Sequence, residues 1–284
     1  MRILGITQKV GLIGWPVGHS YSPLIHNAAF EFCGLDYVYV PLPVQPGNLS
    51  EAVAGLKSLG FVGANVTVPH KVEIMAYLDE IDEQAKQIGA VNTIVVKEGV
   101  LTGYNTDAPG FLAALKGKGC SLAGKNALLL GAGGAARAVA AALAPEVACL
   151  TIAARRREQA DELANLFLNR SVNTVTWPSN EWEQSLSKAD LIIHSTPMGM
   201  SPQVEAEPVF AWNRCKTDTF FCDLIYNPLE TLFLQKARGQ GYPVLGGLAM
   251  LVEQAALAFE IWTGQEAPRS KMMDVAAQAV KASL

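Results

Sequence analysis

The stretch that decides the fold reads N-A-L-L-L-G-A-G-G-A-A-R-A over residues 126–138. Its apolar run, Ala127–Leu130, is typical of a buried strand, and the alanine-rich segment 135–144 is typical of a helix. Between them lies G-x-G-x-x-A, in which the first glycine makes a tight turn and the second lets the backbone approach a pyrophosphate at the helix N-terminus. This context favours a Rossmann-like dinucleotide-binding unit; a glycine-rich turn in an ordinary α/β domain is the alternative.

Three consecutive arginines follow the next predicted strand, which covers 148–154. At the corresponding position a protein that binds NAD carries Asp or Glu, which binds the ribose 2′-hydroxyl. Arg155, Arg156 and Arg157 stand there instead, and guanidinium groups suit a 2′-phosphate. A solvated, basic helix start is the alternative, but cations are unfavourable at a helix N-terminus. The arginines therefore favour NADP as the cofactor.

Strands and helices alternate along much of the chain, a pattern that predicts an α/β fold with a mostly parallel sheet in the N-terminal stretch. Pro109-Gly110 and Gly246-Gly247 mark the boundaries between chemically different stretches. Further strands are expected at residues 10–14, 37–44, 61–68, 92–96, 191–196 and 220–225, and helices at 23–32, 49–59, 110–116, 248–262 and 268–282.

The composition excludes several classes of protein. Of the 284 residues, 50% are hydrophobic and 17% are charged, which excludes a disordered chain. The net charge of −4 gives none of the basic character that nucleic-acid binding requires. The longest charge-free apolar stretch, 126–136, is too short for a membrane span of about 20 residues. We therefore expect neither a nucleic-acid partner nor a membrane partner.

The cysteines and histidines indicate the compartment and the metal content. The five cysteines are scattered and form no C-x-x-C pair, which is typical of reduced, buried thiols in a cytoplasmic protein. The start of the chain shows no signal-peptide pattern, in keeping with that location. The four histidines lack the spacing of zinc ligands, so no metal is expected.

Two serines lie directly before a predicted helix. Ser20 and Ser22 precede Pro23, a residue favoured at the first helical position, so that the hydroxyls and the helix amides can converge on one anion. Judged by spacing alone, a serine that caps the helix is as good an interpretation as a pair of serines that binds an anion.

A second polar cluster is expected at the carboxyl ends of the strands in the N-terminal half. Asn65 and Thr67 lie on one face of their strand by period-2 alternation. Lys71 opens the next predicted helix, where a cation is disfavoured unless it is paired, and Asp107 closes this half. Because ligands bind outside the carboxyl ends of parallel strands, the four side chains could converge there. A surface ion pair between Lys71 and Asp107 is the alternative.

Eight motifs, in order across almost the whole chain, resemble the shikimate dehydrogenase family. They are G-W-P-V-G-H-S-Y-S-P-L-I-H-N (14–27), G-A-N-V-T-V-P-H-K (63–71), G-A-V-N-T (89–93), G-Y-N-T-D-A-P-G (103–110), G-A-G-G-A-A-R-A (131–138), S-T-P-M-G-M (195–200), D-L-I-Y-N-P-L-E-T (223–231) and G-G-L-A-M-L-V-E-Q-A (246–255). The resemblance implies the reduction of 3-dehydroshikimate to shikimate by NADPH in the aromatic amino-acid (chorismate) pathway. It also implies a substrate-binding domain over 1–107, completed by helices in 248–284, and a Rossmann-like NADP-binding domain over 108–247.

The resemblance further assigns roles to individual residues. Lys71 and Asp107 would be the catalytic pair. The substrate carboxylate would be bound by Ser20, Ser22 and Tyr226. The ring hydroxyls would be bound, and the pocket ordered, by Thr67, Asn92 and Gln254 together with Asn65. The cofactor would contact Gly131, Ala132, Gly133, Gly134, Ala135, Arg155, Arg156, Thr196, Met198, Gly247 and Met250.

Two departures from the family pattern stand out. His194 occupies the position before S/A-T-x-x-G-M at which the family commonly has Asn. Ala154-Arg155-Arg156 replaces the Asn-Arg-Thr that is typical of NADP-dependent members, so that only Arg155 matches. These departures bear on the adenine side of the cofactor site and leave the fold and the reaction unaffected.

Ketone reduction needs a hydride and a proton, and a positioned Lys71 ammonium can supply the proton without a metal. A quinate/shikimate dehydrogenase with relaxed substrate and cofactor use is one alternative function, which an acid near Arg155 would support. Another is a non-catalytic, ligand-sensing homologue, which the presence of both Lys71 and Asp107 disfavours. A methylenetetrahydrofolate dehydrogenase is disfavoured by the paired serines. We expect a monomer or a homodimer.

Overall fold

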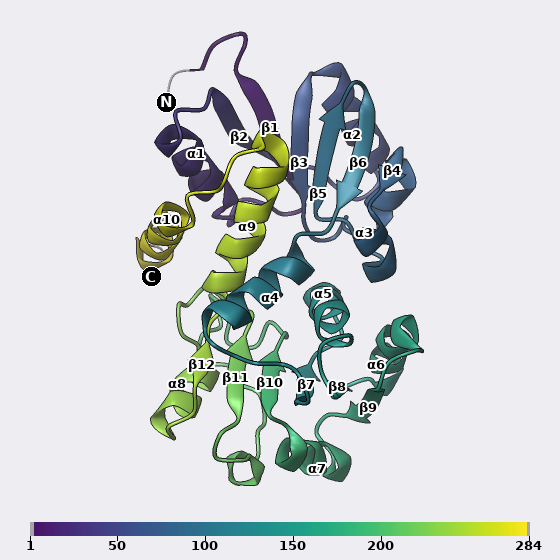
Figure 1. Cartoon of the computed structure of the whole chain (residues 1–284), viewed down its shortest axis with the longest axis vertical. Helices are drawn as coiled ribbons and strands as arrows, with labels where there is room; N and C mark the ends of the chain where they lie inside the picture. Colours follow the sequence, from purple (N-terminus) through teal and green to yellow (C-terminus); the bar gives the residue numbers. More distant parts are fainter. Residues whose placement is uncertain (1–2, 283–284) are drawn as a thin grey trace. The chain divides into compact units, whose positions relative to one another are not determined.

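The computed structural model of the chain describes residues 3–282. These residues form two compact units, each built on a six-stranded sheet. The first unit runs to Gly110 and takes in Val252–Ala279, and the second comprises Phe111–Leu251 with the end of the last helix. The α/β class and the two parallel-rich sheets expected from the sequence are confirmed (Figure 1).

The sheet of the first unit has the order β2-β1-β3-β5-β6-β4, and only β5 runs against the other five strands. Its strands are β1 (Gln8–Gly14), β2 (Tyr37–Pro43), β3 (Phe61–Val66), β4 (Glu80–Ile81), β5 (Thr93–Lys97) and β6 (Val100–Tyr104). The helices that contribute residues to this unit are α1 (Ser22–Phe32), α2 (Leu49–Ser58), the 3-10 helix η1 (Glu73–Tyr77), α3 (Glu83–Ile88), α4 (Asp107–Gly117), α9 (Leu248–Thr263) and α10 (Arg269–Ala282).

Strand β5 is reversed because a two-residue turn joins it to β6. Lys97 pairs with Val100, and the residues between them, Glu98 and Gly99, have φ angles of 52° and 79°. Two consecutive positive φ angles define a hairpin turn whose twist matches that of the flanking strands. The turn sequence Glu-Gly is not one of the usual hairpin signals, so neither β6 nor this hairpin was predicted from the sequence. The reversal puts the start of β5 at the carboxyl edge of its neighbours.

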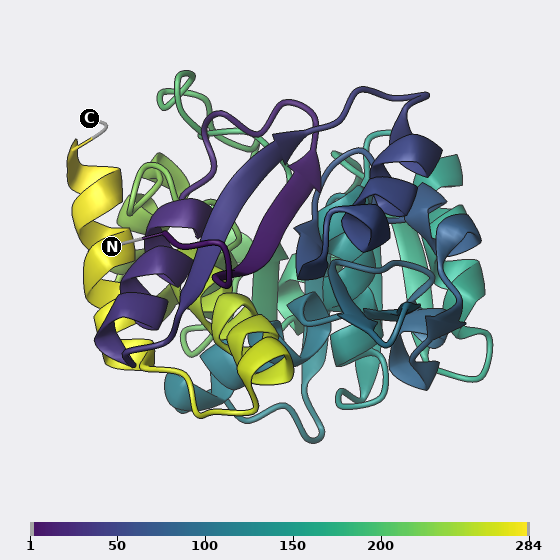
Figure 2. The same cartoon turned by 90° about the horizontal axis from the view of Figure 1, so that it is seen from above.

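Helices cover both faces of this first sheet. On one face lie α1 and α9 (Figure 2). There Phe30 of α1 stacks on Phe259 of α9, with ring centroids 5.3 Å apart. The indole Nε1 of Trp262 donates to the Ile94 carbonyl at 2.9 Å, and Gly63 leaves the space that this ring needs. On the other face α2, η1 and α3 bury Leu49, Val53, Leu56, Ile74 and Ala85 against the strands.

The second unit has the strand order β12-β11-β10-β7-β8-β9, and every pair is parallel (Figure 1). The strands are β7 (Asn126–Leu130), β8 (Cys149–Ala154), β9 (Val172–Thr176), β10 (Leu191–His194), β11 (Phe220–Asp223) and β12 (Val244–Leu245). Counted along the unit, this is the doubly wound dinucleotide-binding order 3-2-1-4-5-6 read from the far edge, so the expected Rossmann-like fold is confirmed. The strand order reverses between β7 and β10.

Two strands and three α-helices of this unit were not predicted, nor were its two short 3-10 helices. Strand β9 is short and half-polar, and β12 has only two residues. Helices α6 (Arg157–Ala164) and α7 (Asn180–Lys188) have largely polar sequences, and α8 (Leu232–Gly239) has only a short apolar run, Leu232–Leu234, at its start. The remaining helical elements are α5 (Gly134–Leu143), η2 (Asn165–Phe167) and η3 (Trp212–Arg214).

None of the helices within residues 3–282 combines the length and the apolar character that crossing a membrane requires. All five cysteines are free thiols. The expectation that they are buried holds only for Cys222, since the other four are half-buried.

Gly110 brings α4 into close contact with the backbone of α9. A Cβ added there would lie 2.7 Å from the Gln254 nitrogen and 2.9 Å from its Cα. We therefore expect Gly110→Ala to lower the free energy of unfolding by about 1–3 kcal/mol, the usual cost of overpacking, although Ala is the better helix former.

Gly55→Ala in α2 is the matched control, because a Cβ added at Gly55 meets nothing within 4 Å. It should raise the free energy of unfolding by up to about 1 kcal/mol. Urea denaturation of the two variants measures both effects, and stabilisation by Gly110→Ala would contradict the close contact.

Candidate active site

A largely buried ion pair joins Lys71 and Asp107 in the first unit. The Lys71 Nζ lies 2.6 Å from the Asp107 Oδ2, and the two side chains are 23% and 12% exposed. Asp107 is the first residue of α4. The expectation that Lys71 opens a helix is wrong, because it lies in the turn between β3 and η1. The low exposure distinguishes this pair from an ordinary surface ion pair.

Asn105 holds Asp107 in place. Its Oδ1 accepts from the backbone nitrogens of Asp107 and Ala108, at 3.0 and 3.2 Å, and its Nδ2 donates to the Ala90 carbonyl at 2.9 Å. These bonds use an asparagine to cap buried N–H groups at the start of α4, which have no partner within the helix. This role of Asn105 was not predicted, although an asparagine just before a helix start is a recognisable capping signal.

Two buried asparagines connect β3, β5 and the segment before α4. Asn65 Nδ2 donates to the Asn92 carbonyl and to Thr93 Oγ1, both at 3.1 Å. Asn92 Oδ1 accepts from the Thr106 nitrogen at 2.8 Å, and its Nδ2 donates to Thr106 Oγ1 at 3.0 Å. Both N–H groups of Asn65 are thus used within the protein, whereas Asn92 Nδ2 makes one bond within residues 3–282. Asn65 therefore orders the network, and Asn92 retains a donor.

Tyr39 supports this network from β2. Its hydroxyl donates to Asn65 Oδ1 at 2.9 Å and lies within hydrogen-bond reach of Ser22. Two bonds from the Asn27 side chain, at 2.9 and 2.8 Å, fix the Tyr39 backbone, and the His26 ring stacks on the Tyr39 ring at 4.5 Å. Burial raises the pKa of Tyr39, which keeps the hydroxyl a donor, and lowers the pKa of His26 to about 3, which keeps that ring neutral.

Ser20 and Ser22 lie side by side at the start of α1. Ser20 Oγ donates to Ser22 Oγ at 3.2 Å and accepts from the Ser22 nitrogen at 3.3 Å. The N-cap residue of α1 is Tyr21, whose side chain makes no capping hydrogen bond, so neither serine holds the N-cap position. Ser20 still accepts from the first N–H of the helix, that of Ser22, so a capping contact remains part of its role.

Thr67 and Gln254 complete the predicted residues of the first unit. Strand β3 ends at Val66, so Thr67 lies just beyond it and donates its N–H to the Ile13 carbonyl at 2.8 Å. Gln254 lies in α9 and packs against Gly110 of α4. Gly110 in turn follows Asp107 by one helical turn. Tyr226, also expected to bind the substrate, belongs to the second unit, where it follows β11.

The predicted cofactor loop lies at the carboxyl end of β7, where the strand order reverses. Gly131 has a φ of 109°, and a Cβ there would lie 2.7 Å from Ser195 Oγ. Helix α5 starts at Gly134 with no side-chain cap and no acidic residue in its first turn, and side chains added at Gly133 and Gly134 would meet nothing within 4 Å. An open, uncapped helix N-terminus fits the pyrophosphate of a dinucleotide.

The arginine cluster divides into two kinds of side chain. Arg157 forms an ion pair with Glu181 at 3.4 Å. Arg155 and Arg156 are exposed, and neither side chain has a hydrogen bond or an ion pair within the part of the chain that the structure describes. Two cations rather than three are thus available to a phosphate at the end of β8.

The other predicted cofactor residues occupy two loops of the second unit. Thr196 and Met198 follow β10, directly beside the glycine turn after β7. Gly247 precedes α9, and a Cβ there would lie 2.1 Å from the Leu224 carbonyl oxygen, so a side chain would push apart the loops that it connects. Met250 lies half-buried in the first turn of α9.

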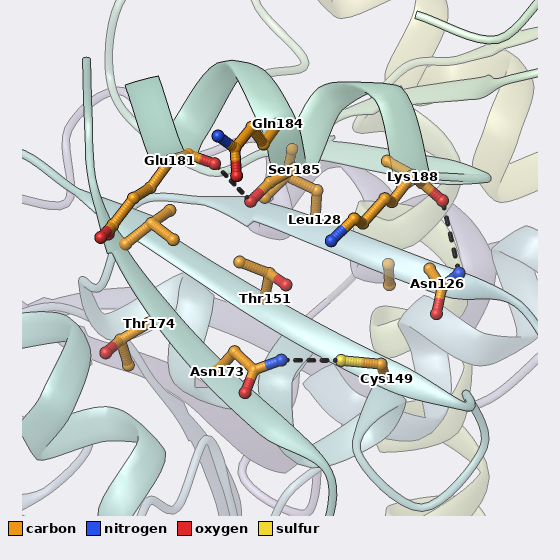
Figure 3. Close-up of a pocket in the computed structure, with 13 residues that line it drawn as sticks. Asn126, Leu128, Cys149, Thr151, Asn173, Thr174, Glu181, Gln184, Ser185 and Lys188 are labelled. Atoms are coloured by element: carbon orange, nitrogen blue, oxygen red, sulfur yellow. Dashed lines mark hydrogen bonds between the residues drawn. The ribbon is translucent and has the colours of Figure 1, made fainter. Parts of the chain in front are cut away.

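A pocket of about 360 Å³ lies elsewhere in the second unit (Figure 3). Asn126 and Cys149, the first residues of β7 and β8, line it together with Glu181 and Lys188 from α7. It contains none of the predicted site residues and lies at the strand starts, away from the carboxyl ends at which such sheets bind ligands. It is therefore not the candidate site.

Comparison with known proteins identifies the family. The family model described as shikimate dehydrogenase substrate binding domain matches residues 12–94, the one described as shikimate / quinate 5-dehydrogenase matches 112–228, and the one described as shikimate 5′-dehydrogenase C-terminal domain matches 247–277. A shikimate dehydrogenase (NADP+) from Desulforamulus reducens is 47% identical over 96% of each chain. The chain belongs to the shikimate dehydrogenase family.

Solved structures of shikimate dehydrogenases share the fold. A crystal structure of shikimate dehydrogenase in complex with NADP+ is 43% identical, covers 98% of each chain and has a TM-score of 0.93. The shikimate 5-dehydrogenase from Thermus thermophilus, in complex with NADP(H) and shikimate, is 37% identical over 96% of this chain and 99% of its own, with a TM-score of 0.86.

The hydrogen bond from the Tyr39 hydroxyl to Asn65 can be tested by removing that hydroxyl. Tyr39→Phe leaves the buried Asn65 Oδ1 without its donor, so we expect a loss of about 1–3 kcal/mol in the free energy of unfolding. Tyr37→Phe, in the same strand, removes a longer bond of 3.3 Å from a half-buried side chain and should cost clearly less. Urea denaturation of both variants measures the difference, and equal losses would show that the Asn65 network does not depend on Tyr39.

Proposed function

We propose that this chain catalyses the reversible, NADP-dependent reduction of 3-dehydroshikimate to shikimate, a step of aromatic amino-acid biosynthesis. The observation that carries the proposal is the buried Lys71–Asp107 ion pair at the carboxyl edge of the first sheet, in a chain of the shikimate dehydrogenase family. The uncapped N-terminus of α5 and the two unpaired arginines support NADP as the cofactor.

In this proposal the ammonium of Lys71 is the general acid. As a hydride adds to the ketone carbon, the ketone oxygen takes a proton from Lys71 Nζ, so that one C–H and one O–H bond form. In the reverse direction the neutral amine takes that proton back from the hydroxyl. The Asp107 carboxylate accepts one of the three N–H groups of the ammonium and thereby orients the other two.

The remaining substrate residues bind and orient. Ser20, Ser22 and Tyr226 bind the substrate carboxylate, and Thr67, Asn92 and Gln254 bind the ring hydroxyls. The free N–H of Asn92 suits this role, whereas Asn65, whose N–H groups are both used, holds Asn92 in position. Residues 1–107 with 248–284 form the substrate domain in this proposal, and 108–247 form the NADP domain.

NADPH supplies the hydride when it is bound. Its pyrophosphate would be held by the backbone amides of Gly131, Ala132, Gly133, Gly134 and Ala135, and its 2′-phosphate by Arg155 and Arg156. Thr196, Met198, Gly247 and Met250 complete the cofactor residues. The cytoplasmic location, the monomeric or homodimeric state and the absence of nucleic-acid partners stay predictions.

A turnover assay with two substrates and two cofactors tests the function directly. We expect oxidation of shikimate with NADP+ and much slower rates with quinate or with NAD+. Comparable rates for both substrates and both cofactors would instead favour a quinate/shikimate dehydrogenase. Binding of shikimate without turnover would leave the ligand-sensing alternative.

Removal of the Lys71 ammonium tests the catalytic pair. Lys71→Met keeps the length of the side chain but removes the proton donor, so kcat should fall by about 10²- to 10⁴-fold while the affinity for NADP+ is retained. The control is Lys57→Met, which breaks the exposed ion pair of Lys57 with Asp79 at 2.8 Å. Steady-state kinetics should show an unchanged kcat for this control. A Lys71→Met enzyme with the wild-type kcat would exclude Lys71 as the general acid.

The unpaired arginines are expected to select NADP+ over NAD+. A charge-assisted hydrogen bond contributes about 1.5–3 kcal/mol, so Arg155→Ala should raise the KM for NADP+ by about 10- to 100-fold and leave the KM for NAD+ nearly unchanged. Arg157→Ala is the matched control, because that side chain already pairs with Glu181. A larger effect at Arg157 than at Arg155 would contradict the division of the cluster.

A further inference from the structure

A chain of three polar side chains crosses the carboxyl edge of the second sheet. His194 ends β10 and Asp223 ends β11, and both side chains are fully buried. His194 Nδ1 lies 3.1 Å from Asp223 Oδ2, close but off the ideal hydrogen-bond direction. On the other side of the ring, His194 Nε2 lies 2.5 Å from Thr196 Oγ1.

The neighbours of Asp223 determine where the protons lie. Asp223 Oδ1 accepts from the Ile225 nitrogen at 3.0 Å, and Oδ2 accepts from Thr231 Oγ1 at 2.7 Å. A lone pair on His194 Nδ1 would face a carboxylate oxygen, so a ring that carries one proton holds it on Nδ1. Nε2 is then an acceptor, and the Thr196 hydroxyl must donate to it.

This proton order fixes the loop that follows β10. With its hydrogen directed to His194, the Thr196 oxygen has only lone pairs left, and the Met198 nitrogen approaches one of them at 3.4 Å. Thr196 also lies against the glycine turn, since a Cβ added at Gly131 would be 3.1 Å from Thr196 Cγ2. The loop therefore borders the turn at the point where the strand order reverses.

We propose that His194 is a positioning residue for the cofactor: backed by Asp223, it holds the Thr196 hydroxyl as a hydrogen-bond acceptor at the edge of the dinucleotide site. The ligand group that suits such an acceptor is a donor, a ribose hydroxyl or an amide N–H, rather than a phosphate oxygen. The inference rests on the proposed binding of NADP by this unit, and it assigns His194 a task that does not involve contact with the ligand.

The test separates the two contacts of the His194 ring. In His194→Asn the amide lies where Nδ1 lies and can still donate to Asp223, but it does not reach Thr196. Thr196→Val removes the hydroxyl and keeps the shape of the side chain. The dissociation constant of NADP+, measured by calorimetry without substrate, should rise by about 2- to 10-fold in each single variant. The double variant should bind no more weakly than Thr196→Val alone, because both changes break the same contact.

Thr219→Val is the structural control. Thr219 is a fully buried threonine of the same unit whose hydroxyl donates to the Ala189 carbonyl at 3.2 Å. This variant should lower the melting temperature and leave NADP+ binding unchanged. If His194 acted in folding alone, His194→Asn would give this same result.

The outcomes are distinct. Unchanged NADP+ binding in His194→Asn or in Thr196→Val, or additive losses in the double variant, would overturn the positioning role. A wild-type chain that binds NADP+ but does not oxidise shikimate would overturn the proposed reaction and leave the His194 inference standing. A wild-type chain that does not bind NADP+ would overturn both.

Discussion

The hydrogen bonds around Asn92 are the constraint on which the first unit depends. A buried amide must have all its strong polar contacts made within the protein or by a ligand, or it costs free energy. Asn92 meets most of this requirement through the Thr106 backbone and side chain, which leaves one N–H of its amide unused within residues 3–282. Asn65 adds a bond to the Asn92 carbonyl. These contacts fix the end of β3, the start of β5 and the segment that enters α4. They therefore also fix the distance between Lys71 and Asp107.

Further residues of the first unit hold the predicted site residues in position. Tyr39, held by Asn27 and stacked on His26, reaches Asn65 from the second strand, and Asn105 caps the helix that carries Asp107. Tyr39 and Asn105 each touch a predicted site residue, and each is itself held by packing or by the backbone. Such support keeps reacting groups within the narrow range of geometry that catalysis needs. The second unit repeats the arrangement, with Asp223 behind His194 and His194 behind Thr196.

Glycines define the places of closest approach. Gly63 leaves room for the Trp262 ring, Gly110 for the backbone of α9, and Gly247 for the Leu224 carbonyl. At each position a Cβ would lie under 3.0 Å from its neighbour, which real side chains almost never do. The motifs of the sequence contain these glycines, but their spacing alone does not reveal what each one touches, because the contacts join segments that are distant in the chain.

The sequence by itself determined the fold class, the glycine turn between β7 and α5, the basic end of β8 and the family, because these rest on local periodicity and short motifs. Only the tertiary structure decided which polar groups meet. The reversal of β5, caused by a Glu-Gly turn that carries no strong signal, brings Asn92 to the carboxyl edge, whereas a parallel strand would put it at the opposite end. The partner of Tyr39 was likewise hidden, because its apolar strand sequence says nothing about which side chain its hydroxyl meets. The His194 contact with Asp223 depends on the register of two strands. Side-chain partners across strands are long-range pairings, and no local pattern encodes them.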